Sequence, residues 1–198
     1  MIETEEVPGY AFAYLLHRLV EERTSRLKQE SKDEEYAKFM APKEFNRLKS
    51  LKLLFFAAAV NANNEGDSLL DAFGEFTAYP QGPVVEEIYQ LMKENRLPLF
   101  MVKKEGLEER PGENIDQVKE CLAGVSPKTM LKIDRAIEEL KKMNKELIDY
   151  SASVLVDITH KWLAWSLSMF TNDNLTSYQK MNKDAIKKEC EVISLYYI

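Results

Sequence analysis

The sequence has few of the residues from which catalytic and metal sites are usually built. Of 198 residues, two are histidine, two are cysteine and seven are glycine. The cysteines, Cys121 and Cys190, are far apart and have no Cys or His neighbour at zinc-ligand spacing, which indicates neither a zinc site nor a disulfide framework. Scarce glycine leaves little material for a phosphate-binding loop, and no nucleophile-elbow, zinc-protease, Walker or dinucleotide motif occurs. We therefore expect no cofactor and no metal.

The chain also lacks an excess of positive charge and a long apolar run. Lys and Arg number 27 against 33 Asp and Glu, and the net charge of −6 argues against a surface that binds the phosphates of nucleic acid. The charge-free run 53–64 is far shorter than the ~20 residues that cross a bilayer, and the first 20 residues do not resemble a secretion signal. We expect a cytoplasmic protein that binds neither nucleic acid nor membrane.

What the sequence does contain is helical patterning around one very apolar segment. Residues 53–60 carry no polar side chain, and a helix of this kind must be covered on all sides. We expect a central helix that begins at Ala41-Pro42 and ends near Ala62. The predicted fold class is mainly α: a helical domain of six or seven helices around a buried central helix, with a small two-stranded β insertion (α+β).

Apolar spacing and capping residues predict the other elements. The further helices are expected at 12–27, from Pro83 to 92, at 115–122, from Ser126-Pro127 to Leu147, from Ser151 or Ser153 to Met169, and from Asn182 to 193. Whether the helix that contains His160 continues unbroken past it is not decided by the spacing. A strand is expected at 75–79, and 97–102 is either a second strand beside Phe76 or an extended connector. We expect a loop at 172–174 and a docked tail at 195–198.

The segment 29–35 has no apolar residue, so the first helix either ends there or continues as a solvated spacer. On this basis residues 1–40 are predicted to be an N-terminal helical extension and residues 41–198 the main domain.

Only a few residues are candidates for chemistry. His17 lies in an ordinary amphipathic helix, so a structural or surface role is favoured. His160 follows Thr159 and lies near Trp162 and Trp165; a histidine that hydrogen-bonds within the fold is favoured, and a working site residue is the alternative. Cys121 has no basic neighbour, and the two tryptophans match the spacing of a core stripe. An enzyme is therefore disfavoured.

Several short motifs follow one another in a specific order. They are Leu51-Lys52-Leu53-Leu54-Phe55-Phe56-Ala57, Leu70-Asp71, Phe76 to Tyr79, Gln81-Gly82-Pro83-Val84, and Leu155 with Thr159-His160 and Trp165. Together, over about residues 45–193, they resemble the Panacea domain, the SocA-like family found in phage-associated proteins and antitoxins. Ala58-Ala59-Val60-Asn61 departs from the glutamine or tryptophan-histidine usual in that family. Residues 1–40 are acidic and unlike the DNA-binding domain that some relatives carry there.

The resemblance implies a protein that acts by binding another protein, without catalysis. It would be an antitoxin that holds a cognate toxin inactive, or an adaptor that delivers a client to a protease. The hypothetical partner-binding residues are Tyr79, Gln81, Gly82, Pro83, His160 and Trp165, with the two aromatic residues Tyr79 and Trp165 as anchors. The alternative is that these residues only lock the β insertion to the helices.

Two other functions remain open at this point. One is a phage-derived structural protein that forms a homo-oligomer such as a homodimer, with the helix 12–27 as the seam between its chains. The other, less favoured, is a hydrolase that uses His160 as a base.

Overall fold

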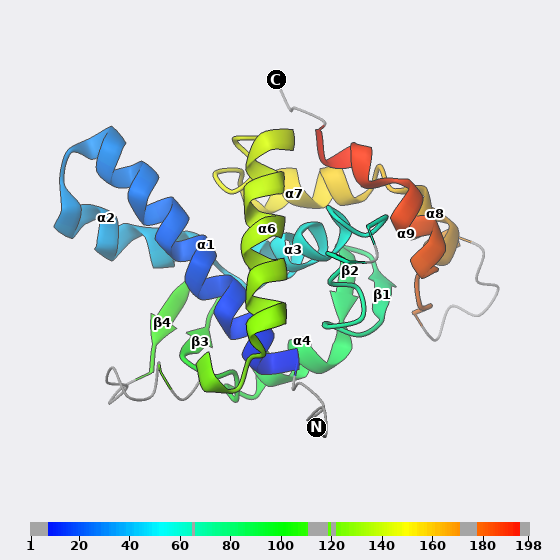
Figure 1. The fold of residues 1–198 in the computed structure, drawn as a ribbon, viewed down its shortest axis with the longest axis horizontal. Helices are drawn as coiled ribbons and strands as arrows, with labels where there is room; N and C mark the ends of the chain where they lie inside the picture. The colour runs from blue at the N-terminus through cyan, green and yellow to red at the C-terminus, as the bar shows by residue number, and fades with distance from the viewer. Residues whose placement is uncertain (1–7, 65, 111–118, 120–121, 171–177, 195–198) are drawn as a thin grey trace.

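The computed structural model describes residues 8–64, 66–110, 119, 122–170 and 178–194. Within them the fold is mainly α, as predicted, with eight α-helices and two small antiparallel sheets (Figure 1). The α-helices are α1 (Pro8–Ser31), α2 (Glu34–Met40), α3 (Arg47–Ala59), α4 (Glu86–Lys93), α6 (Pro127–Met143), α7 (Ala152–Thr159), α8 (Leu163–Phe170) and α9 (Lys183–Lys188). The strands are β1 (Phe76–Tyr79), β2 (Gly82–Val85), β3 (Phe100–Val102) and β4 (Leu107–Glu109), and 3-10 turns cover Ala41–Glu44 and Cys190–Ser194.

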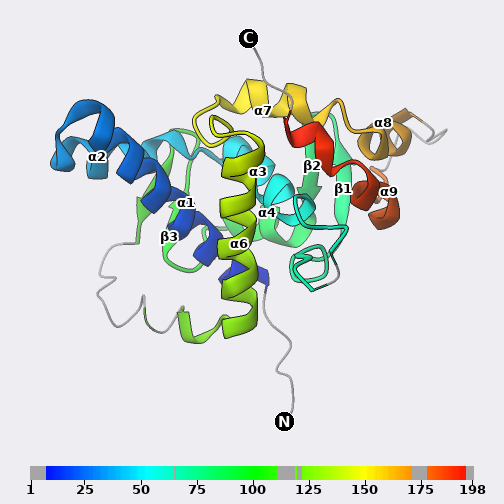
Figure 2. The ribbon, with the colours of Figure 1, turned by 45° about the horizontal axis from the view of Figure 1, so that its top comes forward.

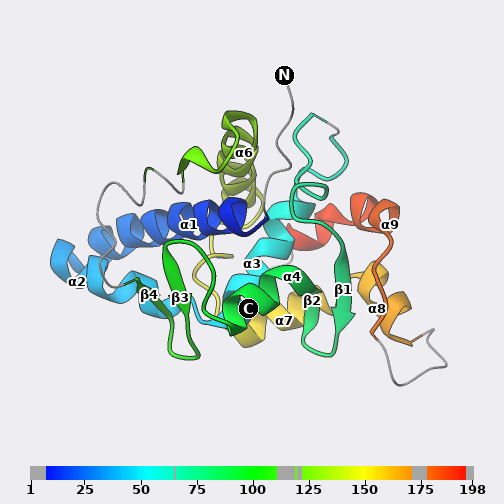
Figure 3. The same cartoon turned by 90° about the horizontal axis from the view of Figure 1, so that it is seen from below.

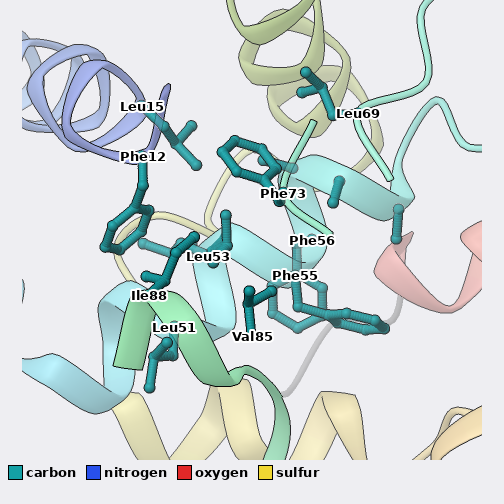
Figure 4. Packing of buried hydrophobic residues seen from close by; sticks show 14 of the residues in the cluster. Phe12, Leu15, Leu51, Leu53, Phe55, Phe56, Leu69, Phe73, Val85 and Ile88 are labelled. Carbon is teal, nitrogen blue, oxygen red and sulfur yellow. The ribbon is translucent and has the colours of Figure 1, made fainter. Parts of the chain in front are cut away.

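Helix α3 is the buried central helix that the apolar segment predicts. All its residues from Lys49 to Ala59 are buried, and α1, α6, α7 and β2 pack around it. Figure 4 shows side chains from α1, β2 and α4 converging on those of α3. Phe55 makes edge-to-face contacts with the rings of Phe76 and Trp162, with centroids 5.2 and 4.8 Å apart. The most apolar stretch of the chain thus forms the centre of the core.

The predicted start of this helix at Pro42 is wrong. Pro42 lies in the 3-10 turn Ala41–Glu44, and α3 begins only after Asn46, whose side chain accepts a hydrogen bond from the Lys49 N–H. The backbone at Phe45 leaves the helical region and separates the two segments. Helix α3 also ends at Ala59, before the predicted Ala62.

The β insertion consists of a tight hairpin and a second, separate sheet. Strand β1 matches the predicted strand, and its Tyr79 pairs with Gly82, so Pro80 and Gln81 alone form the turn. The prediction that Pro83 opens a helix is wrong, because this short turn places Pro83 within β2, and α4 begins at Glu86. The segment around Phe100 pairs with β4 and not with Phe76, so that alternative is also wrong.

The C-terminal half follows the predicted caps more closely. Ser126 caps α6, which ends at Met143, before the predicted Leu147. Ser151 caps α7 and Asn182 caps α9. The helical conformation is interrupted between Thr159 and Leu163, so α7 and α8 are separate helices. The predicted loop at 172–174 and tail at 195–198 lie outside the described residues, as does most of the predicted helix 115–122.

The N-terminal helices lie at one end of the molecule and α8 and α9 at the other (Figures 1 and 2). Helix α1 ends at Ser31, and Asp33 caps α2, so the polar segment 29–35 contains a helix boundary. The apolar stripe of α1 from Phe12 to Leu19 is buried in the same core as α3, and Leu27 is buried against α2, so the stripe is not available as a seam between two chains. The division of the chain at residue 40 stays a prediction. No described helix has the length and apolar character that a bilayer span requires.

Candidate partner-binding site

The turn between β1 and β2 meets the break between α7 and α8. Trp165 donates a hydrogen bond from its indole Nε1 to the carbonyl oxygen of Tyr79 at 2.9 Å. The Nε2 of His160 lies 3.0 Å from the carbonyl oxygen of Pro80 and, because a carbonyl can only accept, carries the proton. The His160 and Trp165 rings are stacked, with centroids 4.0 Å apart and planes 15° apart. This pair of rings clamps the turn through its backbone.

Gly82 is held from beneath by two other elements. A Cβ atom added at Gly82 would lie 2.3 Å from the Thr159 Oγ1 and 2.8 Å from the Lys52 Nζ. Its φ of +89° also lies in the left-handed region, which favours glycine. Only glycine lets the hairpin approach α3 and α7 this closely, so the Gly-Pro pair has a clear structural role.

Lys52 is a buried cation on the central helix, and the sequence interpretation missed it. Its side chain is fully buried, and its Nζ donates a hydrogen bond of 2.8 Å to the Pro83 carbonyl oxygen. Burial disfavours the ammonium form and lowers the pKa of Lys52 to about 7. The available signal was a lone lysine between Leu51 and Leu53, both of which are core residues.

The six predicted residues lie together, but they differ in what they offer to a partner. Gln81 is exposed, and Tyr79 and His160 are half-buried. Gly82, Pro83 and Trp165 are buried and act as supports under the turn. The Tyr79 hydroxyl donates to the Glu86 carboxylate, and this hydrogen bond together with burial raises the pKa of Tyr79 to about 12. The structure thus supports a locking role for the buried members, while a role in partner binding stays a prediction.

Beside the turn, α8 presents an apolar face that sequence reasoning missed. Leu163, Leu167 and Phe170 are 57%, 49% and 78% exposed, and no residue of the helix is charged. The opposite side of α8 buries Ala164 and Trp165. The face was missed because the expectation for this segment followed only the core stripe of Trp162, Trp165 and Met169 and left out the opposite side of the helix. The signal was the sequence LAWSLSMF, which is too apolar for a helix buried on one side only.

Electrostatic contacts fix the start of α8. The carboxylate of Glu189 accepts hydrogen bonds of 2.8 Å from the backbone N–H groups of Leu163 and Ala164. A negative charge at a helix N-terminus is stabilising, and here it also joins α8 to the segment after α9. Among the described residues, no cluster of three or more His, Cys, Asp or Glu has the geometry to hold a metal ion.

We compared the chain with known proteins. The family model described as antitoxin SocA-like, Panacea domain, matches residues 51–166, which include most of α3, both hairpins, α7 and the first part of α8. Comparisons with curated proteins and with solved structures gave no significant match. The matched segment is more than half of the 198 residues and contains every residue of the β1–β2 turn and of its clamp. The chain therefore belongs to the SocA-like antitoxin family that carries the Panacea domain.

Proposed function

We propose that this protein is an antitoxin that binds a cognate protein toxin through a surface here called the α8–turn surface. It consists of Leu163, Leu167 and Phe170 on α8 with Tyr79 and Gln81 at the β1–β2 turn. The observation that carries the proposal is the exposure of three large apolar side chains on one uncharged helix. Such a cluster is typical of a surface that is covered by a partner.

The α8–turn surface has the composition expected of a binding site. Its centre is apolar and aromatic, and its edge carries polar groups such as Gln81 and the half-buried His160. Burying one exposed Leu or Phe side chain contributes about 1.5 to 3 kcal/mol. Two such anchors together are therefore worth about 3 to 6 kcal/mol, which corresponds to at least a hundredfold in affinity.

The underlying structure limits the cost of ordering this surface. The His160–Trp165 stack, two hydrogen bonds to the turn and the Glu189 contact to α8 hold the backbone that carries the anchors. A surface that is ordered before binding loses less conformational entropy when the partner docks.

The test is coexpression with the toxin encoded by an adjacent reading frame, identified as a small protein that arrests growth when expressed alone. The double variant Leu163→Ser/Phe170→Ser is expected to lose growth protection and to bind the purified toxin about 100-fold more weakly or worse. The matched control is Phe39→Ser/Leu131→Ser, which removes one Phe and one Leu that are 62% and 50% exposed on α2 and α6.

The control variant should protect cells as the parent protein does. Equal protection by both double variants, with equal toxin affinity, would contradict the proposed surface. If no adjacent or coexpressed toxin is neutralised by the parent protein, the antitoxin function itself is wrong.

Direct neutralisation and delivery of the toxin to a protease both begin with this contact. A host strain that lacks its cytoplasmic ATP-dependent proteases separates them. We expect protection to persist there, because the exposed apolar side chains of α8 provide anchors for a direct contact with the toxin. Loss of protection in that strain, with unchanged toxin affinity, would assign the adaptor role instead.

A further inference from the structure

A second feature of the same region is a cavity of about 720 Å³ between the start of α3, the β1–β2 turn and α4. Figure 3 shows these three elements next to one another. The apolar part of its wall includes Leu51 and Val84, and two aromatic residues, Tyr79 and Tyr89, add their rings. Small-molecule sites typically have ~300 to 1,000 Å³ and a mainly apolar wall with a few polar groups. The cavity has the size and composition of such a site.

The charged residues of this wall are both cations, although the chain has a net charge of −6. They are Arg47, at the first position of α3, and Lys104, in the loop after β3. Among the described residues neither has a carboxylate within ion-pair distance. Other arginines do have carboxylate partners, namely Arg18, Arg23, Arg26, Arg96 and Arg135.

The guanidinium group of Arg47 is only partly used by the fold. Its Nη2 donates to the Val102 carbonyl oxygen at 3.3 Å, while its buried Nε has no hydrogen-bond partner within the described part of the chain. Because this Nε is enclosed by protein, a ligand in the cavity would meet the Nη groups and the positive charge of Arg47. Arg47 is thus a positioned donor with remaining capacity, beside a second cation in an apolar cavity.

Two side-chain amides complete the polar part of the wall. The Oδ1 of Asn46 caps α3 by accepting from the Lys49 N–H, so its amide nitrogen is the group left to donate. Gln81 is exposed at the rim and carries both a donor and an acceptor. Amides of this kind match the mixed donors and acceptors on the edge of a nucleobase.

From these groups we infer that the cavity binds a mononucleotide, with its phosphate on Arg47 and Lys104 and its base against the tyrosine rings. Arginine and lysine bind phosphate through charge-assisted hydrogen bonds, and aromatic side chains stack on bases without requiring one particular base. The carboxylate of Glu86 accepts a hydrogen bond from the Tyr79 hydroxyl but does not line the cavity. The phosphate of the nucleotide would therefore meet Arg47 and Lys104 without a carboxylate in the cavity wall. This inference does not rest on the proposed antitoxin function.

The test uses the purified full chain with the four ribonucleoside 5′-monophosphates, the matching nucleosides and inorganic phosphate, in equilibrium dialysis and thermal-shift assays. At least one nucleotide is expected to bind with a Kd below about 1 mM and its nucleoside at least ~10-fold more weakly. Lys104→Gln, an exposed change that leaves the core untouched, and Arg47→Gln should each weaken nucleotide binding about tenfold or more.

Arg96→Gln is the matched control, because it removes the same charge from an exposed arginine outside the cavity and should leave the affinity unchanged. Absence of binding by all four nucleotides overturns the inference, as does nucleotide binding that both cavity variants retain. If no nucleotide binds and Lys104→Gln instead loses the toxin, the cavity belongs to the protein interface and the inference is wrong. Tyr79 and Gln81 belong to both the cavity and the α8–turn surface, so nucleotide binding that persists in the α8 variants while toxin binding is lost supports a site in the cavity that does not need α8.

Discussion

The buried ammonium group of Lys52 makes the stability of this protein depend on pH in a range where few other groups titrate. Lys52 has a hydrogen bond to the Pro83 carbonyl and is fully buried, and its pKa falls from 10.5 to about 7 in the folded state. Below pH 7 both the folded and the unfolded chain bind this proton, so the cost of burying the charge is fully present. Between pH 7 and 10.5 only the unfolded chain binds it, so the free energy of unfolding rises with pH.

Lys52→Met removes this titration and leaves an unbranched apolar side chain that is one atom shorter. One pKa unit corresponds to ~1.36 kcal/mol, so from pH 7 to pH 10 the parent protein should gain about 4 kcal/mol of stability relative to the variant. At pH 10 the variant should be less stable by about 1 to 3 kcal/mol, because the Pro83 carbonyl has lost its donor. At pH 6 the order should reverse, since the variant buries no charge.

The assay is urea denaturation of both proteins at pH values from 6 to 10. The difference in free energy of unfolding is the informative quantity, because titrations common to both proteins cancel in it. Lys93→Met, on the exposed side of α4, serves as the control and should differ from the parent by a constant amount. A parent-minus-Lys52→Met difference that stays flat between pH 7 and 10 would refute the reasoning, because it would mean that Lys52 titrates alike in both states.

Three further predictions concern the clamp and the N-terminal helices. In thermal denaturation, Gly82→Ala should lower the free energy of unfolding by about 3 kcal/mol or more, because the new Cβ clashes with its neighbours and the backbone is in the left-handed region. The control is Gly74→Ala, which has a similar φ of +87° but open space around it and should lower the free energy of unfolding by only about 1 kcal/mol. His160→Ala should cost about 1 to 2 kcal/mol by removing one hydrogen bond and one ring stack, yet should retain toxin neutralisation. A variant that folds normally and still binds the toxin but is inactive in cells would revive the hydrolase hypothesis. Arg23→Met should lower the free energy of unfolding by about 2 to 4 kcal/mol in urea denaturation, because the partly buried Glu44 carboxylate loses the two hydrogen bonds that it accepts from Arg23. A change below about 0.5 kcal/mol would contradict this.

Much of the fold was predictable because it depends on local signals. The uninterrupted apolar segment 53–60 required a covered helix, and α3 is that helix. Ser126 with Pro127, and Asn182, mark helix starts because their side chains satisfy free N–H groups at the first turn. Phe76 to Tyr79 formed the predicted strand because its alternation and its aromatic residues favour extended backbone.

The errors occurred where a proline is compatible with two local structures or a strand has two possible partners. Pro83 is suited to the first turn of a helix and also to a strand after a tight turn, and pairing with Ala78 decided for the strand. The segment around Phe100 was expected either as a strand beside Phe76 or as an extended connector, but β4 is nearer along the chain and pairs with it through a short turn. In both cases the partner strand, which local propensity does not contain, made the choice.

The candidate site shows the same division. The order of motifs was enough to identify the family and the six residues around the β1–β2 turn, because each motif is a short pattern of residue types. The spacing of Leu163, Leu167 and Phe170 places them on one side of a helix, but that this side stays uncovered depends on how the distant segments of the chain pack.

By itself, then, the amino-acid sequence determined which segments are helical, which one is central, and the family to which the chain belongs, because these follow from residue type and spacing within short windows. Only the tertiary structure decided that Lys52 is enclosed by the hairpin and α7, that Arg47 and Lys104 face one cavity, and that α8 leaves three apolar side chains in solvent. The physical reason is that burial, charge pairing and exposure depend on residues far apart in the chain.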